Sequence, residues 1–173
     1  LSIYQIQFFR SLLGIGVIIL VQIVLRQPVM FTTAYPVLSI LRGIMFFCLY
    51  SLFYFAQSKI PIASATVLYL ANPFFTTLIA ILLFKSNVGY KHWLIIIVGF
   101  FGVVLICQPN TGAFNSYYLL PLLTALLYSL IVSITKLTSE KDNRFQQLFY
   151  MYLIPVLLSG LAVIAVGHGR FDT

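Results

Sequence analysis

The feature that most constrains this chain is a series of six apolar runs, separated only by short polar segments. The runs cover about residues 3–25, 38–56, 62–84, 92–107, 116–136 and 147–167. A helix needs about 20 predominantly apolar residues to cross the roughly 30 Å hydrocarbon core of a bilayer, and the run at 92–107 is the shortest of the six. The pattern predicts an all-α, polytopic membrane protein with six transmembrane helices.

The composition agrees with a lipid environment. Only 8% of the residues are charged and 61% are hydrophobic, whereas a soluble domain is about 25% charged. The formal net charge of +7 does not indicate a nucleic-acid partner, because Lys and Arg occur as ones and twos at the ends of apolar runs and form no basic face. The lipid bilayer is therefore the expected partner, and nucleic acid is not.

The loop charges predict an orientation. Because short loops rich in Lys and Arg stay on the cytoplasmic side, the loops that hold most of the basic residues are expected to be cytoplasmic. One set of alternating loops holds Arg26, Arg42, Lys85, Lys91, Lys136, Lys141 and Arg144, and the other set holds only Lys59 and Arg170. The first helix then runs from outside to inside, with residue 1 on the outer face of the membrane.

Arg10 is the one charge that lies well inside an apolar run. A guanidinium in the hydrocarbon core costs several kcal/mol unless it is paired or hydrated, so such residues usually face a cavity or a partner helix. The alternative is that Arg10 lies near the outer interface and extends its side chain to the lipid headgroups. Under the first interpretation, Arg10 is a candidate substrate-binding residue.

The 62–84 run carries three polar residues on one helical face and a proline. Tyr69, Asn72 and Thr76 are spaced i, i+3 and i+7, and Pro73 removes one backbone donor near the membrane midplane. Interrupted helices at this depth present polar groups to the solute in transporters. In ordinary bundles, by contrast, Asn and Thr simply form hydrogen bonds to neighbouring helices.

Two other runs carry aromatic residues with hydroxyl groups. Phe47, Tyr50 and Tyr54 share one face of the 38–56 run, and Thr124 and Tyr128 are one turn apart in the 116–136 run. Such rings suit the wall of a binding chamber, and they equally suit the aromatic belt at a membrane interface.

No constellation of residues indicates catalysis or a metal site. The acidic residues Glu140, Asp142 and Asp172 all lie in loops, and Cys48 and Cys107 are far apart in the sequence. An enzyme would need paired carboxylates, a cluster of metal ligands or a nucleophile with its base inside the spans. We therefore predict a protein that is not an enzyme and has no cofactor, no metal and no catalytic residue.

A weak internal repeat relates the first and last apolar runs. The segment from Tyr4 to Leu13 resembles the segment from Phe145 to Ile154, with Gln5 aligned on Gln146, Phe8 on Phe149 and Leu12 on Leu153. Because the two helices are the first and the sixth span, five spans apart and thus an odd number, they are predicted to cross the membrane in opposite directions. Inverted repeats of this kind permit alternating access.

Several motifs, taken in order, resemble the EamA domain of the drug/metabolite transporter superfamily. They are Tyr4 to Arg10, Leu41-Arg42-Gly43, Ala65-Thr66 to Asn72-Pro73-Phe74-Phe75-Thr76, and Trp93 through Gly99-Phe100-Phe101-Gly102-Val103 to Pro109. The resemblance implies a ten-helix fold of two inverted five-helix repeats. Residues 1–109 would then be the first repeat without its first helix (helices 2–5), and residues 110–173 would be the start of the second repeat (helices 6 and 7).

The chain departs from the family pattern after the third run. Family members often carry Gly-Glu there, where this sequence has Lys85-Ser86-Asn87, so the contacts of that glutamate are in doubt. Within the superfamily, Phe8-Phe9-Arg10 together with Leu41-Arg42-Gly43 looks most like the S-adenosylmethionine uptake branch. Exporters of amino acids and other metabolites share much of the same pattern.

The sequence therefore favours a transporter of a small polar metabolite that works by alternating access. Arg10 or Arg42 would contact a carboxylate or phosphate of the solute, aromatic walls would come from Tyr50 and Tyr69, and Asn72 would orient the solute. The full set of predicted substrate-binding residues is Arg10, Arg42, Tyr50, Tyr69, Asn72, Thr76 and Tyr128. The alternatives are a metabolite exporter of the same superfamily and, from another class, a membrane scaffold or assembly subunit that transports nothing. A homo-oligomer is a further expected partnership.

Overall fold

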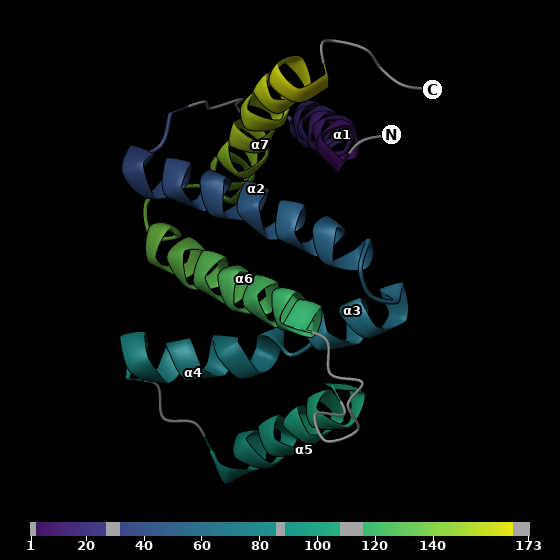
Figure 1. Cartoon of the computed structure of the whole chain (residues 1–173). Coiled ribbons are helices and arrows are strands. Elements are labelled where there is room, and N and C mark those ends of the chain that lie inside the picture. Colours follow the sequence, from purple (N-terminus) through teal and green to yellow (C-terminus); the bar gives the residue numbers. More distant parts are fainter. Residues whose placement is uncertain (1–2, 27–31, 86–88, 108–115, 168–173) are drawn as a thin grey trace. The chain divides into compact units, whose positions relative to one another are not determined.

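The computed structural model describes residues 3–26, 32–85, 89–107 and 116–167, and within these ranges it contains helices and no strand (Figure 1). The elements are α1 (Ile3–Val24), α2 (Pro36–Gln57), α3 (Ile62–Tyr69), α4 (Asn72–Phe84), α5 (Tyr90–Cys107), a single 3₁₀ turn η1 (Ser116–Tyr118), α6 (Leu119–Thr138) and α7 (Arg144–Gly167). The all-α fold predicted from the sequence is confirmed.

Five helical segments are long and apolar enough to cross a membrane. They are α1, α2, α3 with α4, η1 with α6, and most of α7, and they match five of the six predicted runs. The remaining run, at 92–107, forms α5, a helix of 18 residues, which at about 1.5 Å per residue extends roughly 27 Å. A helix of this length falls just short of the hydrocarbon core, so its crossing of the membrane stays a prediction.

The third span is interrupted where the sequence predicts it. The helix α3 ends at Tyr69, and α4 begins at Asn72 with Pro73 in its first turn. Pro73 has no N–H to donate, and its ring would collide with the preceding turn of a continuous helix. Between the two helices the amide of Ala71 donates to the carbonyl of Leu68 at 3.1 Å, a tighter 3₁₀-type turn that ends α3.

Many polar side chains are buried, and many large apolar side chains are exposed. On α1 the buried residues include Gln5, Gln7 and Ser11, whereas Leu13 and Val24 are 70% and 72% exposed. This is the reverse of a soluble helix, whose apolar stripe faces the core. The distribution is that of a protein whose outer surface contacts lipid.

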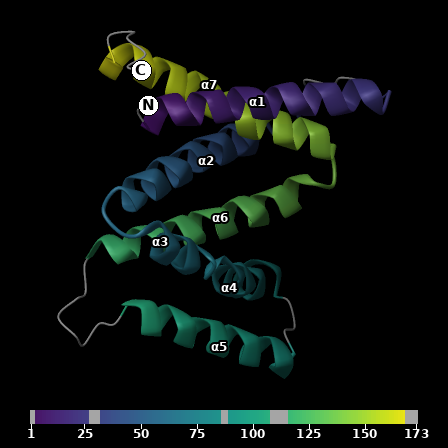
Figure 2. The same cartoon turned by 90° about the vertical axis from the view of Figure 1, so that its right-hand side faces the viewer.

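The chain packs as two compact units. The first comprises residues 1–51 and 134–173, and the second comprises residues 52–133. In the first unit α1 and α7 lie side by side (Figure 2), and α1 packs mainly against α7. A Cβ atom added to Gly14 would lie 2.8 Å from the ring of Tyr152, and one added to Gly160 would lie 3.4 Å from the ring of Phe8. Early residues of α1 thus meet late residues of α7, so the predicted opposite directions of these helices are confirmed.

The helix α2 also approaches α7 closely in this unit. A Cβ atom added to Gly43 would lie 2.5 Å from the Cβ of Ile154, which is well inside van der Waals contact. Glycine therefore permits α2 and α7 to pack backbone against side chain at this point.

In the second unit, the end of α4 has a strained backbone. Lys85, the C-cap residue, adopts the left-handed conformation with φ 48° and ψ 36°. A residue with a side chain is disfavoured there and glycine is preferred.

Candidate functional site

The first candidate site is formed by Arg10 of α1 against two rings of α2. The Cζ atom of Arg10 lies 3.5 Å from the centroid of the Tyr50 ring and 5.3 Å from that of Phe46. Phe46 in turn makes edge contacts with Tyr50, at 4.8 Å between centroids, and with Tyr152 of α7, at 5.5 Å. Phe46 and Tyr50 share one face of α2 because they are four residues apart. The structure thus brings together two of the predicted residues, Arg10 and Tyr50.

The guanidinium of Arg10 has one edge that no other described residue satisfies. Its Nε and Nη2 atoms are buried and have no hydrogen-bond partner among the described residues. These two nitrogens present parallel N–H groups, the arrangement that binds both oxygens of a carboxylate or phosphate. Since Tyr50 covers the face of the guanidinium, an acceptor would approach this edge in the plane of the group.

A buried amide lies one turn before Arg10. Gln7 is 0% exposed; its Nε2 donates to the backbone carbonyl of Phe47 at 3.1 Å, and its Oε1 accepts from the hydroxyl of Ser51 at 3.1 Å. Our sequence reasoning did not single out Gln7. The signal was present, because a glutamine in the middle of an apolar helix requires a polar partner.

Arg42 is placed differently from Arg10. It is 0% exposed, its Nη2 donates to the carbonyl of Gln147 at 2.6 Å, and its Nη1 lies 3.4 Å from the hydroxyls of Thr135 and Thr138. The carboxylate of Asp142 attracts its charge. Arg42 therefore joins α2 to the end of α6 and the start of α7.

Asp142 extends this network to the segment before α2. The carboxylate is 5% exposed; it accepts from the amide of Ala34 at 2.7 Å and from the hydroxyl of Thr33. Gln146 adds a hydrogen bond to the carbonyl of Thr32 at 2.8 Å. Asp142 and Gln146 thereby hold the segment that precedes α2, near the N-terminus of that helix, where a negative charge is favourable.

The other predicted residues gather in the second unit, around the interruption between α3 and α4. The ring of Tyr69 lies 5.3 Å from that of Phe53 and 5.9 Å from that of Tyr128. One turn further on, the carbonyl of Asn72 accepts from the hydroxyls of Thr76, at 2.8 Å, and Ser129, at 2.9 Å. The two hydroxyls are 3.0 Å apart. The structure thus groups Tyr69 with Tyr128, and Asn72 with Thr76.

Ser129 was also missed from the sequence. It is 0% exposed and joins α6 to the start of α4. Its signal was its spacing with Ser133, one turn further along the same apolar helix. The contact that the structure records for Asn72 here is made by its backbone carbonyl.

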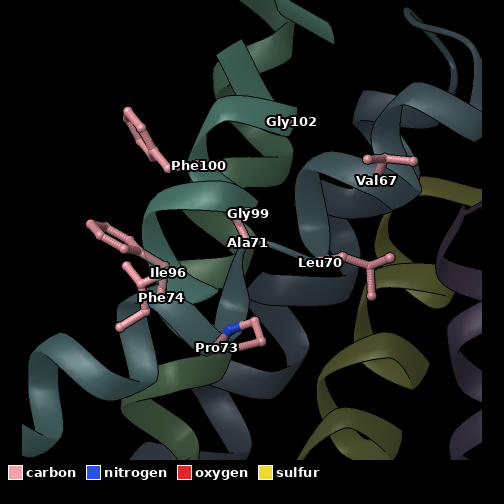
Figure 3. A pocket seen from close by; sticks show the side chains of 9 residues that line it. All are labelled: Val67, Leu70, Ala71, Pro73, Phe74, Ile96, Gly99, Phe100 and Gly102. Carbon is pink, nitrogen blue, oxygen red and sulfur yellow. The ribbon is translucent and has the colours of Figure 1, made fainter. Parts of the chain in front are cut away.

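A separate cavity of about 340 Å³ in the second unit lies beside the interruption (Figure 3). It is lined by Val67, Leu70, Ala71, Pro73, Phe74, Ile96, Gly99, Phe100 and Gly102. None of the predicted substrate-binding residues lines this cavity, and its apolar wall does not suit a polar solute.

Comparison with known proteins supports the family resemblance. The model of the EamA-like transporter family matches residues 1–108. The chain is 26% identical over 156 residues to an S-adenosylmethionine uptake transporter of Rickettsia prowazekii, covering 90% of this chain and 53% of the relative. It is 33% identical over 109 residues to a riboflavin transporter of Rhizobium johnstonii, covering 62% and 36%. It is also 24% identical over 158 residues to a pseudopaline exporter of Pseudomonas aeruginosa, covering 90% and 54%.

These matches fix the class of protein. The chain spans about half the length of the S-adenosylmethionine transporters that it matches, and no solved structure matches it. The named relatives are transporters, which agrees with a protein that is not an enzyme. Together with the membrane-length helices, they identify an integral, multi-pass protein of the bacterial cytoplasmic membrane. The chain belongs to the EamA-like transporter family.

Proposed function

We propose that this protein moves a small metabolite bearing a carboxylate group across the cytoplasmic membrane, and that Arg10 binds the carboxylate. The observation that carries the proposal is the buried edge of the Arg10 guanidinium, whose Nε and Nη2 atoms have no hydrogen-bond partner among the described residues. Family membership supports transport, and the chemistry of this edge supports an anionic group on the solute.

The energetics favour an anion at this edge. A guanidinium removed from water costs several kcal/mol when it is uncompensated. The contact with the Tyr50 ring, at 3.5 Å, returns about 0.5–2 kcal/mol, and a hydrogen bond to a charged group contributes about 1.5–3 kcal/mol more. A carboxylate that bonds to both nitrogens supplies the missing stabilisation, so Arg10 gives binding energy to solutes that carry such a group.

S-adenosylmethionine is the first candidate, because several named relatives are uptake transporters for it and cover 90% of this chain. This metabolite carries the required carboxylate. Export is the second candidate direction, favoured by the match to a pseudopaline exporter over the same share of the chain.

The other predicted residues take supporting roles in this proposal. Tyr50 forms an aromatic wall beside Arg10, and Tyr69 and Tyr128 provide further aromatic surface in the second unit. Asn72 and Thr76 supply polar groups at the interruption of the third span, where transporters commonly present backbone and side chains to solute. Arg42 reaches a solute only if its hydrogen bonds to Gln147 and the two threonines open.

The test is uptake into proteoliposomes of S-adenosylmethionine and of decarboxylated S-adenosylmethionine, which differ only in the carboxylate. Wild type is compared with Arg10→Lys and Arg10→Ala, and with Arg144→Lys, a matched control at an exposed arginine. The quantity measured is the uptake efficiency of S-adenosylmethionine divided by that of its decarboxylated form. Because a lysine cannot form the two parallel bonds, we expect this ratio to fall about tenfold or more in Arg10→Lys, corresponding to about 1.4 kcal/mol.

Two results would overturn the proposal. If the wild type transports neither compound in either direction, the proposal is wrong and the alternative of a membrane scaffold that transports nothing is favoured. If Arg10→Lys slows the uptake of both compounds equally, or of neither, Arg10 does not bind the carboxylate of the solute. The control variant Arg144→Lys keeps the wild-type ratio.

A further inference from the structure

The helix α1 reaches α2 through long side chains. Among the described residues, α1 packs chiefly along α7, and its backbone makes few close approaches to α2. The contacts from α1 to α2 include those of Arg10 with Phe46 and Tyr50, and those of Gln7 with Phe47 and Ser51. Side chains therefore set how α1 is rotated and shifted against α2.

Gln7 fixes the position of α1 against α2, and its own amide fits in one orientation. Its Nε2 can only donate, and it meets the carbonyl of Phe47; its Oε1 can only accept, and it meets the hydroxyl of Ser51. An amide turned the other way would place oxygen against oxygen at Phe47. Because Gln7 is 0% exposed, water cannot replace either bond, and such interhelical bonds stabilise packing inside membranes.

The two hydrogen bonds of Gln7 to α2 lie next to the candidate site. Gln7 is one turn before Arg10 on α1, so the two side chains leave the helix on neighbouring parts of one face. On α2, Phe47 directly follows Phe46, and Ser51 directly follows Tyr50. The residues that hold the amide are thus the sequence neighbours of the two rings that hold the guanidinium.

We infer that Gln7 and Ser51 are positioning residues that set Arg10 against Tyr50 and so determine the preference for a carboxylate. This inference rests on the proposed function of Arg10. With the amide in place, the guanidinium stays on the Tyr50 ring, 3.5 Å from its centroid, and its Nε–Nη2 edge keeps a fixed direction. Without the amide, α1 can slide or rotate, and the edge loses its fixed direction.

The experiment compares Gln7→Leu and Ser51→Ala with Gln22→Leu, a matched control at another buried glutamine of α1 about four turns away. The first measurement is the ratio of uptake efficiencies for S-adenosylmethionine and its decarboxylated form. We expect this ratio to fall at least threefold in Gln7→Leu and in Ser51→Ala, mainly through a higher KM for S-adenosylmethionine. Gln22→Leu keeps the wild-type ratio, and Gln7→Leu has no added effect on the ratio in an Arg10→Lys background.

The second measurement reads the position of Arg10 without transport. In the wild type, the Tyr50 ring shifts the side-chain proton resonances of Arg10 upfield, and we expect this shift to be lost in Gln7→Leu and kept in Gln22→Leu. A Gln7→Leu protein that keeps both the shift and the ratio overturns this inference alone. If Arg10→Lys leaves the ratio of the wild type unchanged, the proposed function is overturned instead, whatever the shift shows. Equal slowing of both compounds in Gln7→Leu, with the shift kept, would make Gln7 merely structural and would also overturn the inference.

Discussion

Gly43→Ala is the substitution whose effect follows most directly from the packing. The added Cβ would lie 2.5 Å from the Cβ of Ile154 and 2.7 Å from its Cγ1, whereas carbon atoms pack best at about 3.5–4.0 Å. A change of side-chain rotamer cannot move the Cβ of Ile154, because it is fixed to the backbone. The helices α2 and α7 must therefore separate by about 1 Å.

The separation has a cost that can be estimated from the neighbouring contacts. Overpacking of this kind costs about 1–3 kcal/mol. The bond from Arg42 to the carbonyl of Gln147, now 2.6 Å, joins the same two helices and would lengthen beyond normal hydrogen-bond distance, losing about 1.5–3 kcal/mol. Alanine regains about 1 kcal/mol through its higher helix propensity. The net destabilisation is about 1.5–5 kcal/mol.

The assay is thermal unfolding in detergent, followed by fluorescence-detected size-exclusion chromatography. For a chain of this length, about 1.5–5 kcal/mol lowers the midpoint by roughly 3–20 °C. The matched control is Gly16→Ala on α1, where the structure places no described atom within 4 Å of an added Cβ. We expect its midpoint to stay the same or to rise slightly.

Second-site substitutions at Ile154 sharpen the test. Ile154→Ala keeps the Cβ that causes the clash, so it should not restore the midpoint of Gly43→Ala. Ile154→Gly removes that atom, so in the Gly43→Ala background it should cost less than it does alone. A Gly43→Ala protein as stable as Gly16→Ala would refute the close approach of α2 and α7, and rescue by Ile154→Ala would show that the contact is with the end of the side chain.

Three further substitutions test other parts of the structure with the same assay. Asp142→Asn should lower the free energy of unfolding by about 1–3 kcal/mol, and with it the midpoint, because the buried carboxylate accepts two hydrogen bonds from the segment before α2; Glu140→Gln, at an exposed position, should not, and equal effects would contradict the role of Asp142 in holding that segment. Lys85→Gly should raise the free energy of unfolding by about 1 kcal/mol, since φ is 48° there; a lower midpoint would exclude the left-handed C-cap. Ser129→Ala should lower the free energy of unfolding by about 0.6–2 kcal/mol through loss of the bond to Asn72, and an unchanged midpoint would show that this bond adds no stability.

The sequence predicted the helices well because the length of an apolar run is a local property. The break between α3 and α4 was predictable for the same reason, since Pro73 acts on its own preceding turn. The contact of Arg10 with Tyr50 was not predictable as a pair, because it depends on how α1 lies against α2. Both residues were named as candidates only for their unusual positions in apolar runs.

The contacts of Arg42 could not be predicted from local sequence patterns. From the sequence it is a charge near one end of a span, and a solute contact is a reasonable expectation. Its hydrogen-bond partners, Thr135, Thr138 and Gln147, lie about 100 residues further along the chain, and no spacing rule connects them. Gln7 escaped notice for a related reason, because its partners Phe47 and Ser51 are defined only by packing.

The most direct test of the account is to observe the Nε–H group of Arg10 while solute is added. The measurement is ¹⁵N-edited NMR of the arginine side chains in the reconstituted protein, with the Arg10 signal assigned by its loss in Arg10→Lys. If a carboxylate binds the free edge of the guanidinium, the Nε proton gains a charge-assisted hydrogen bond and its resonance moves downfield. We predict this shift with S-adenosylmethionine and no shift with its decarboxylated form. An Arg10 signal that responds to neither compound, or equally to both, would contradict the central role of this residue.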